Sequence, residues 1–206
     1  MRVIVKDGIL VIAPEAAADA PLLADFGDRH AGHVFHLSRA GEALLLKSMG
    51  PEEDACNLPI NISSRSPAPL NLISNFASTP FVLDGARYAS VEGFWQSLRW
   101  TDPEDRRRIA ALHGIAAKRA GSEQAAPDRF SYGGTEIRWG TADHWQLMRR
   151  ACDAKFKQND AARAALLGTG RRPLRHRTRR DSRSIPGVVM ADIWMAIRHH
   201  LRRNSP

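Results

Sequence analysis

Two acidic side chains stand where a carboxylate could take part in catalysis. Glu92 lies two residues after Ser90, a residue that can cap a helix running to Trp100, so this carboxylate falls in the first helical turn. Asp181 stands among arginines in a segment without helical periodicity. Each acid also has an ordinary structural explanation, a helix-dipole contact for Glu92 and a local salt bridge for Asp181. Both are therefore candidates for acid–base chemistry.

The sequence offers little for a metal ion or a cofactor. His30, His33 and His36 are three residues apart, but no acid or cysteine joins them at a spacing typical of zinc sites. The chain contains no phosphate-binding P-loop, no G-x-G-x-x-G after a strand and no H-E-x-x-H. We therefore expect no metal site and no cofactor.

The charge balance favours an anionic partner. The chain of 206 residues has a formal net charge of +8 at pH 7. A short segment is especially rich in arginine: Arg171, Arg172, Arg175, Arg177, Arg179, Arg180 and Arg183. Guanidinium groups match phosphate geometry, so we expect this segment, and Arg177, Arg179 and Arg180 in particular, to bind phosphate or the backbone of DNA or RNA. The alternative is a basic protein whose charge serves solubility alone.

Compartment signals are few. Only Cys56 and Cys152 are present, far apart, so no disulfide framework is expected. Charges interrupt the first apolar residues, so they do not form a signal peptide, and no apolar run approaches the ~18 residues of a membrane span. We expect a cytoplasmic protein without a membrane partner.

Residues 1–66 have the pattern of a small β-rich extension. Two apolar triplets, 3–5 and 9–11, flank an Asp-Gly pair, which predicts a β-hairpin. Residues 33–37 and 43–46 form a second candidate pair of strands. The alanine-rich stretch 16–24 predicts a short helix, residues 59–62 a further strand, and the proline-rich stretch 63–69 a linker.

Residues 67–206 predict a mainly helical domain. Two short strands, 81–83 and 87–88, precede helices expected at about 90–100, 103–113, 115–120, 141–158, 160–167 and 188–203. Residues 122–138 show no clear periodicity, so we expect an irregular segment there. The fold class is α+β, predominantly helical, with the β-rich extension in front.

Several sequence blocks follow one another in order between residues 70 and 203. They include Leu72-Ile73-Ser74-Asn75-Phe76, Ser90-Val91-Glu92-Gly93-Phe94-Trp95-Gln96, Lys155-Phe156 with Gln158-Asn159, and Leu166-Leu167-Gly168-Thr169-Gly170. This ordered set resembles the NADAR (YbiA-like) family. The resemblance implies a NADAR-like domain and N-glycosidase chemistry. Members of the family hydrolyse phosphorylated intermediates of riboflavin synthesis or remove ADP-ribose from guanine bases.

The resemblance also implies which residues form the site. The family's catalytic glutamate, tryptophan and aspartate fall on Glu92, Trp139 and Asp181, and its substrate pocket on Ser74, Asn75, Phe76, Gln96 and Lys155. A histidine usually follows the family's glutamate, whereas Gly93 follows it here.

Three functions remain open from the sequence. The first is removal of ADP-ribose from guanine in nucleic acid, with Glu92 as general base or stabiliser of the oxocarbenium-like centre. Asp181 would then position the ribose or water, and Trp139 would stack on the base or ribose. The second is N-glycosidase action on phosphorylated riboflavin intermediates. The third is a module that binds ADP-ribose or nucleic acid without turning it over.

Overall fold

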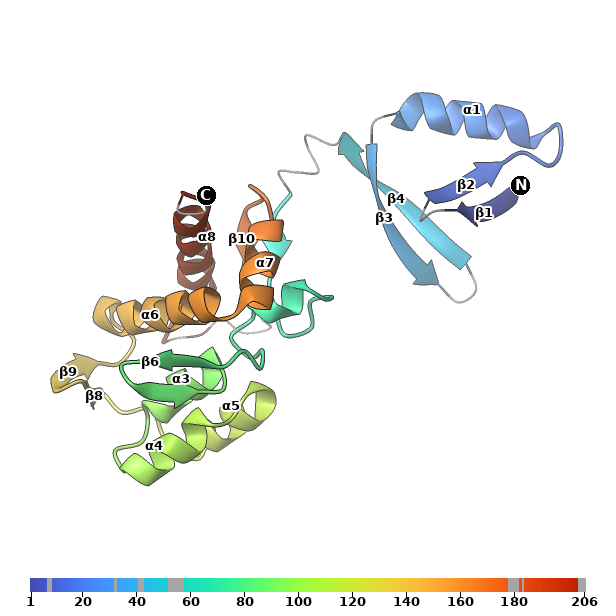
Figure 1. Ribbon diagram of the computed structural model, residues 1–206. Coiled ribbons are helices and arrows are strands. Elements are labelled where there is room, and N and C mark those ends of the chain that lie inside the picture. Colours follow the sequence, from blue (N-terminus) through green and yellow to red (C-terminus); the bar gives the residue numbers. More distant parts are fainter. Residues whose placement is uncertain are drawn as a thin grey trace. The chain divides into compact units, whose positions relative to one another are not determined.

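The computed structural model describes residues 1–6, 9–31, 33–40, 43–51, 58–177, 182 and 184–203. The chain divides into two units, Met1–Leu58 and Pro59–Pro206 (Figure 1). Residues 59–66, which we expected in the extension, belong to the second unit because β5 (Ile60–Asn61) pairs in parallel with β10 (Leu174–Arg175). Within the described ranges, no helix has the length and apolar character needed to cross a membrane.

The first unit consists of two hairpins and one helix. Antiparallel strands β1 (Arg2–Lys6) and β2 (Ile9–Ala13) form the first hairpin, and β3 (His33–Ala40) and β4 (Ala43–Pro51) form the second. Both predicted strand pairs are confirmed. Residues 7–8, where the sequence predicts a turn, and residues 41–42 lie outside the described residues.

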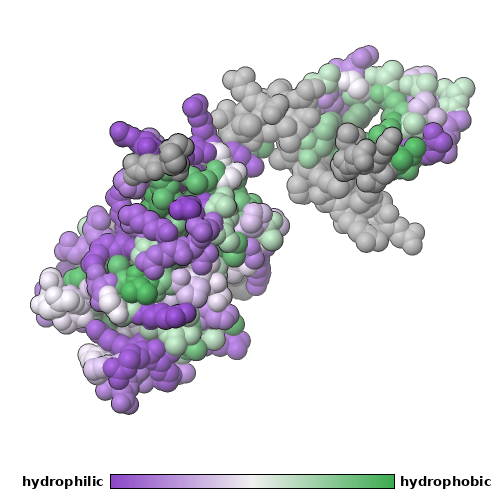
Figure 2. Space-filling view, in the orientation of Figure 1, coloured by the Kyte–Doolittle hydropathy of each residue, from purple (hydrophilic) through white to green (hydrophobic). Residues whose placement is uncertain are grey.

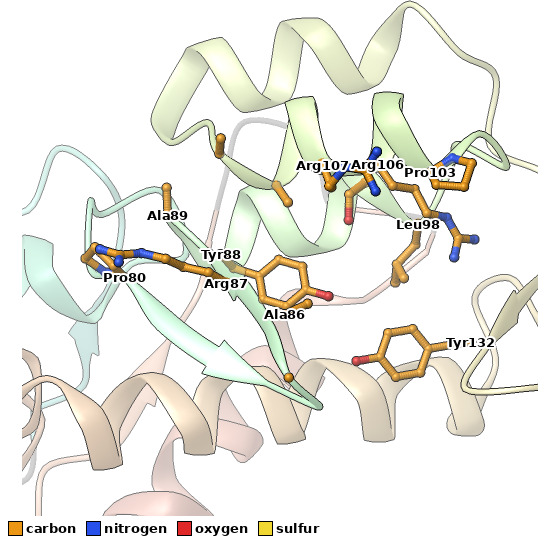
Figure 3. Close-up of a pocket in the computed structure, with 14 residues that line it drawn as sticks. Pro80, Ala86, Arg87, Tyr88, Ala89, Leu98, Pro103, Arg106, Arg107 and Tyr132 are labelled. Carbon is orange, nitrogen blue, oxygen red and sulfur yellow. The ribbon is translucent and has the colours of Figure 1, made fainter.

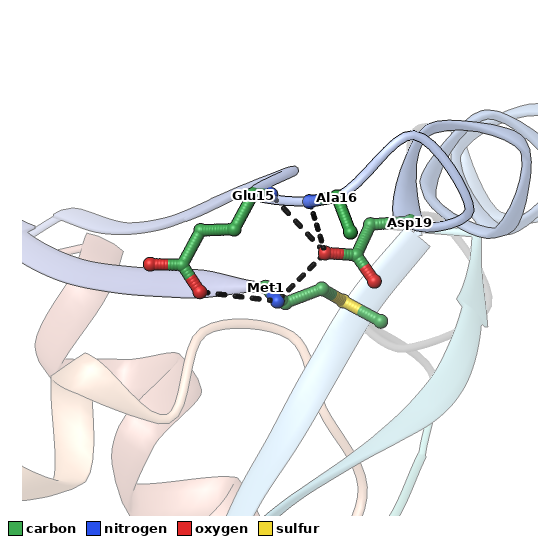
Figure 4. Close-up of polar contacts among 4 residues, drawn as sticks. All are labelled: Met1, Glu15, Ala16 and Asp19. Carbon is green, nitrogen blue, oxygen red and sulfur yellow. Dashed lines mark hydrogen bonds and ion pairs between the residues drawn. The ribbon is translucent and has the colours of Figure 1, made fainter.

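Helix α1 (Asp19–His30) begins later than the predicted stretch 16–24. The Asp19 carboxylate accepts hydrogen bonds from the backbone N–H groups of Glu15 and Ala16 and pairs with the N-terminal ammonium of Met1 at 2.7 Å (Figure 4). These interactions lower the pKa of Asp19 to about 2. They hold residues 15–16 in a turn ahead of the helix, which explains its later start.

The second unit is mainly helical, which confirms the predicted α+β class. Its elements after β5 are the 3-10 helix η1 (Leu70–Ile73), the hairpin β6 (Phe81–Leu83) and β7 (Ala86–Tyr88), α3 (Val91–Ser97), α4 (Pro103–Ala110), α5 (Gly114–Ser122), α6 (Ala142–Gln158), α7 (Asp160–Gly168) and α8 (Gly187–Arg203). Helix α3 packs against α4, α5 and α6, so it lies within the unit (Figure 1).

The prediction of an irregular segment at 122–138 is wrong for its second half. Strands β8 (Arg129–Tyr132) and β9 (Thr135–Arg138) form an antiparallel hairpin there. Gly133 and Gly134 connect the strands with φ of 57° and 79°, a left-handed conformation that glycine adopts without a steric penalty.

Burial in the second unit follows the helical spacing of its apolar residues. Met148, Cys152 and Phe156 of α6 are buried, as are the apolar residues of α8: Met190, Ile193, Trp194, Ile197 and Leu201. All seven residues of α3 are buried, including Glu92 and Gln96. Hydrophilic residues dominate the face of this unit seen in Figure 2. The fold thus places the first turn of α3, with its carboxylate, in the interior.

Candidate active site

Backbone and cap interactions fix the position of Glu92. Ser90 caps α3, its Oγ accepting a hydrogen bond of 2.8 Å from the Gly93 N–H and donating one of 3.0 Å to the Leu112 carbonyl. The Glu92 N–H donates to the Asn75 carbonyl at 2.9 Å. The glutamate is therefore fastened to the Ser74–Phe76 segment as well as to its own helix.

Gly93 allows α3 to approach the end of α4 closely. A Cβ atom at this position would lie 2.4 Å from the Leu112 carbonyl oxygen, a distance that real Cβ atoms do not adopt. A histidine, usual at this place in the family, would require the backbone of residues 109–112 to move. The departure noted in the sequence therefore has a packing cause.

The Glu92 carboxyl group is buried and has one amide partner. The side chain is 6% exposed, and Oε1 accepts a hydrogen bond of 2.7 Å from Gln96 Nε2. Burial raises the pKa of Glu92, while the Gln96 bond and the positive charges of Lys118 and Arg99 oppose this rise. Among the described residues, no donor bonds to Oε2. Within the described part of the chain, Oε2 therefore has no hydrogen-bond partner, and it can accept a hydrogen bond from a water molecule or a substrate.

Glu92 lines a cavity of about 510 Å³. The wall combines the three residues predicted from the first block, Ser74, Asn75 and Phe76, with Gln96, and adds residues that the sequence did not identify. Glu92 is the only carboxylate among the described residues of this wall. The structure thus brings together five of the predicted site residues.

Sulfur atoms orient the Asn75 side chain. Its Nδ2 donates to the Sδ atoms of Met148 and Met190 at 3.8 and 3.6 Å, and its Oδ1 accepts from Cys152 Sγ at 3.9 Å. Burial raises the pKa of Cys152 to about 12, so this thiol keeps its proton and serves as a donor.

Lys155 does not line the cavity. Its side chain is fully buried, and Nζ donates to the carbonyls of Ile73 and Ser74 at 3.1 and 2.8 Å. Burial lowers the pKa of this ammonium to about 7. Lys155 therefore supports the Ser74–Phe76 wall from behind.

Trp139 also lies outside the cavity wall. Its ring packs against Trp95, which does line the cavity, with ring centroids 5.5 Å apart. The His144 ring stacks on Trp95 at 3.7 Å and accepts a hydrogen bond from the Gly140 N–H through Nδ1. Burial lowers the pKa of His144 to about 3, so this histidine is neutral. Trp139 and His144 together fix the aromatic surface that Trp95 presents.

The predicted phosphate-binding segment is described only in part. Asp181, Arg179 and Arg180 lie outside the described residues. Arg177 is exposed and lines a different cavity, of about 600 Å³, beside the start of α8.

The wall of the Glu92 cavity also includes residues that the sequence did not identify, among them Trp95, Arg99, Lys118 and His176. Trp95 and Arg99 follow Glu92 by three and seven residues, the spacing of one helical face, so periodicity read from Glu92 would have found them. Lys118 comes from α5, and His176 is held by the Ile62 carbonyl at 2.9 Å. Only tertiary packing brings these two to the site.

A second and larger cavity, of about 820 Å³, lies between the β6–β7 hairpin, α4 and Tyr132 (Figure 3). Apolar and small residues form much of its wall, and Arg87, Arg106 and Arg107 add positive charge. Within the described ranges, no acidic side chain lines it. Its described wall thus offers no carboxylate of the kind that Glu92 provides in the smaller cavity.

Comparisons with known proteins match the helical unit. The family model "Bacteriophage protein GP30.3" matches residues 68–192. A 17.1 kDa protein from the Gp30-rIII intergenic region of Enterobacteria phage T4 is 36% identical over 122 residues, which cover 57% of this chain and 79% of that protein.

N-glycosidase YbiA of Escherichia coli K12 is 31% identical over 110 residues. That alignment covers 53% of this chain and 64% of YbiA. The solved NMR structure of E. coli YbiA superposes with a TM-score of 0.55 at 25% identity, covering 71% of this chain and 86% of that one. The residues matched by the family model include Glu92 and most of the described wall of its cavity, and the chain belongs to the NADAR (YbiA-like) family.

Proposed function

We propose that this protein is an N-glycosidase that removes ADP-ribose from guanine in nucleic acid. The observation that carries the proposal is the buried Glu92 carboxyl group, the only acid among the described residues of a cavity whose wall also holds two amides, an indole and two cations. The relatives named N-glycosidase YbiA support hydrolysis of an N-glycosidic bond. The net charge of +8 favours a polyanionic substrate.

In this proposal, the bond between ribose C1′ and the base nitrogen breaks while water adds to C1′. The departing base keeps the bonding electron pair and takes up a proton, and positive charge develops on the ribose. Ionised Glu92 stabilises that charge or accepts a proton from the attacking water. Gln96 holds the carboxylate through Oε1, which leaves Oε2 for this task.

We assign aromatic stacking to Trp95, because nucleobases stack readily on such surfaces, and Trp139 supports this ring from behind. Asp181 remains our candidate for positioning the ribose or the water. Arg177, Arg179 and Arg180 remain candidates for contacts to the nucleic-acid backbone.

A second candidate is an N-glycosidase acting on phosphorylated riboflavin intermediates. The two cations in the cavity wall, Arg99 and Lys118, are enough for one phosphate group, and a small substrate needs no extended basic surface.

One experiment separates these functions. The protein is incubated with an oligonucleotide carrying ADP-ribosylated guanine and, separately, with the phosphorylated ribosyl-pyrimidine intermediate, and the products are identified by mass. We expect free ADP-ribose and an intact guanine from the oligonucleotide. Release from the small substrate alone would favour the second candidate. Tight binding without release from either would indicate a binding module instead.

A further inference from the structure

Two cationic side chains in the wall of the Glu92 cavity have no carboxylate partner among the described residues. Arg99 follows α3, and Lys118 lies on α5. Other arginines of this unit, such as Arg108 and Arg163, form ion pairs of 2.8 Å with acids on their own helices. The cavity therefore concentrates positive charge that the described part of the protein does not neutralise.

Arg99 is held in place without using most of its donors. Nη1 donates to the Gln124 carbonyl at 2.9 Å, and the guanidinium carbon lies 5.5 Å from the centroid of the Trp139 ring. Nε is buried and has no acceptor among the described residues. Since a guanidinium has five N–H groups, most of them remain available to a ligand. This arrangement gives Trp139 a function beside the cavity, as the surface on which Arg99 rests.

Glu92 and Arg99 attract each other through space, but no ion pair within 4.0 Å joins them among the described residues, and the carboxyl group is bonded to Gln96. Burial lowers the pKa of Arg99, and the charge of Glu92 offsets this shift only in part. A ligand anion would offset this cost, and a phosphate offers oxygen acceptors in the geometry that an arginine fork and a lysine ammonium match.

We propose that Arg99 and Lys118 form the phosphate subsite of the active-site cavity and select a phosphorylated ribosyl group over an unphosphorylated nucleoside. This inference rests on the proposed function, because it assigns the same cavity to the substrate. It places the phosphate of the reacting sugar on α5 and the end of α3, and leaves the arginines of 171–183 for other contacts.

The test measures binding, so it does not depend on turnover. Titration calorimetry with ADP-ribose and with adenosine compares the wild-type protein with Arg99→Gln, Arg99→Lys and Lys118→Gln. We expect ADP-ribose to bind the wild type more tightly than adenosine does, and this preference to shrink at high salt. Arg99→Gln and Lys118→Gln should each weaken ADP-ribose binding about tenfold or more and leave adenosine unchanged, and Arg99→Lys should retain part of the affinity.

Arg119→Gln is the matched control. Arg119 is the exposed neighbour of Lys118 on α5 and does not line the cavity, so its removal changes net charge equally. Equal loss in Arg119→Gln and Lys118→Gln would overturn the subsite, as would absence of ADP-ribose binding to the wild type. Parallel hydrolysis assays keep the two proposals distinct. Binding that depends on Arg99 without hydrolysis contradicts the proposed function alone, and hydrolysis unaffected by both variants contradicts the subsite alone.

Discussion

Helix α3 separates two cavities that differ in size and in chemistry. At 3.6 residues per turn, Glu92, Gln96 and Arg99 lie on one side of this segment, whereas Ser97 and Leu98 lie on the other. The first side faces the cavity of about 510 Å³ with its buried acid, and the second faces the cavity of about 820 Å³ near Tyr132. The larger space has no acid in its described wall, so the position of a buried carboxylate, and not the volume of the cavity, is what favours the smaller cavity for the proposed reaction.

The largest difference in turnover should appear between two variants, one with a substitution on each side of α3. Glu92→Gln keeps the size and polarity of a buried side chain but removes the carboxylate, so turnover should fall about 10²–10⁴-fold. Ser97→Ala loses a hydrogen bond of 2.7 Å to the Phe94 carbonyl and should change turnover little. Initial rates of base release, with circular dichroism to verify folding, measure both. Equal rates for the two variants would contradict the assignment of the reaction to the Glu92 side of α3.

Lys155, which supports the wall of the Glu92 cavity from behind, should make the free energy of unfolding depend on pH. Lys155 has a pKa of about 7 in the folded protein against 10.5 as its ordinary value. The unfolded chain therefore binds more protons between these values, and the free energy of unfolding should rise with pH, by up to about 1.4 kcal/mol per unit. Urea denaturation from pH 7 to 9 should show the rise in the wild type but not in Lys155→Met. The same slope in both proteins would remove Lys155 as its cause.

Loss of the Gln96 amide should shift the acid limb of the pH profile, which is the range in which activity falls as the pH drops. Its hydrogen bond favours the ionised form of Glu92, so Gln96→Leu should raise the pKa of this acid and move the acid side of the pH profile to higher pH. Gln158→Leu is the control, since Gln158 bonds only to the backbone of Val82 in β6 among the described residues. A limb that moves equally in both variants would show a general effect on folding.

The smallest effect on turnover should come from a substitution beside the larger cavity, on the side of α3 opposite Glu92. Tyr132 donates a hydrogen bond of 2.8 Å to Asp84, which also pairs with Arg150. Tyr132→Phe should lower the free energy of unfolding by about 1 kcal/mol and leave turnover unchanged. A clear loss of turnover in a stable Tyr132→Phe protein would bring the larger cavity into the reaction.

Local sequence patterns predicted the elements that carry the site better than the site itself. Ser90 as a cap placed Glu92 in the first turn of a helix, and the helix expected at 188–203 corresponds to α8. The hairpin at 129–138 was missed although Gly133-Gly134 is a turn signal, because its strands lack long alternation.

The remaining residues depend on packing that local patterns do not encode. Lys118 reaches the cavity because α5 packs against α3. Lys155 is a charged residue that sequence rules place outside, yet it is buried because two carbonyls require donors. The family resemblance indicated Ser74, Asn75 and Phe76. Periodicity could not have found them, because this segment has neither a helical nor a strand pattern.

The acid limb of kcat/KM for base release tests most directly whether the buried Glu92 performs the chemistry. Because burial raises the pKa of Glu92 above its ordinary value of 4.5, wild-type activity should fall as the pH drops through a midpoint above 4.5. The residual activity of Glu92→Gln should lack this limb. A limb at the same midpoint in both proteins would show that another group titrates, and would contradict the assignment of the reaction to Glu92.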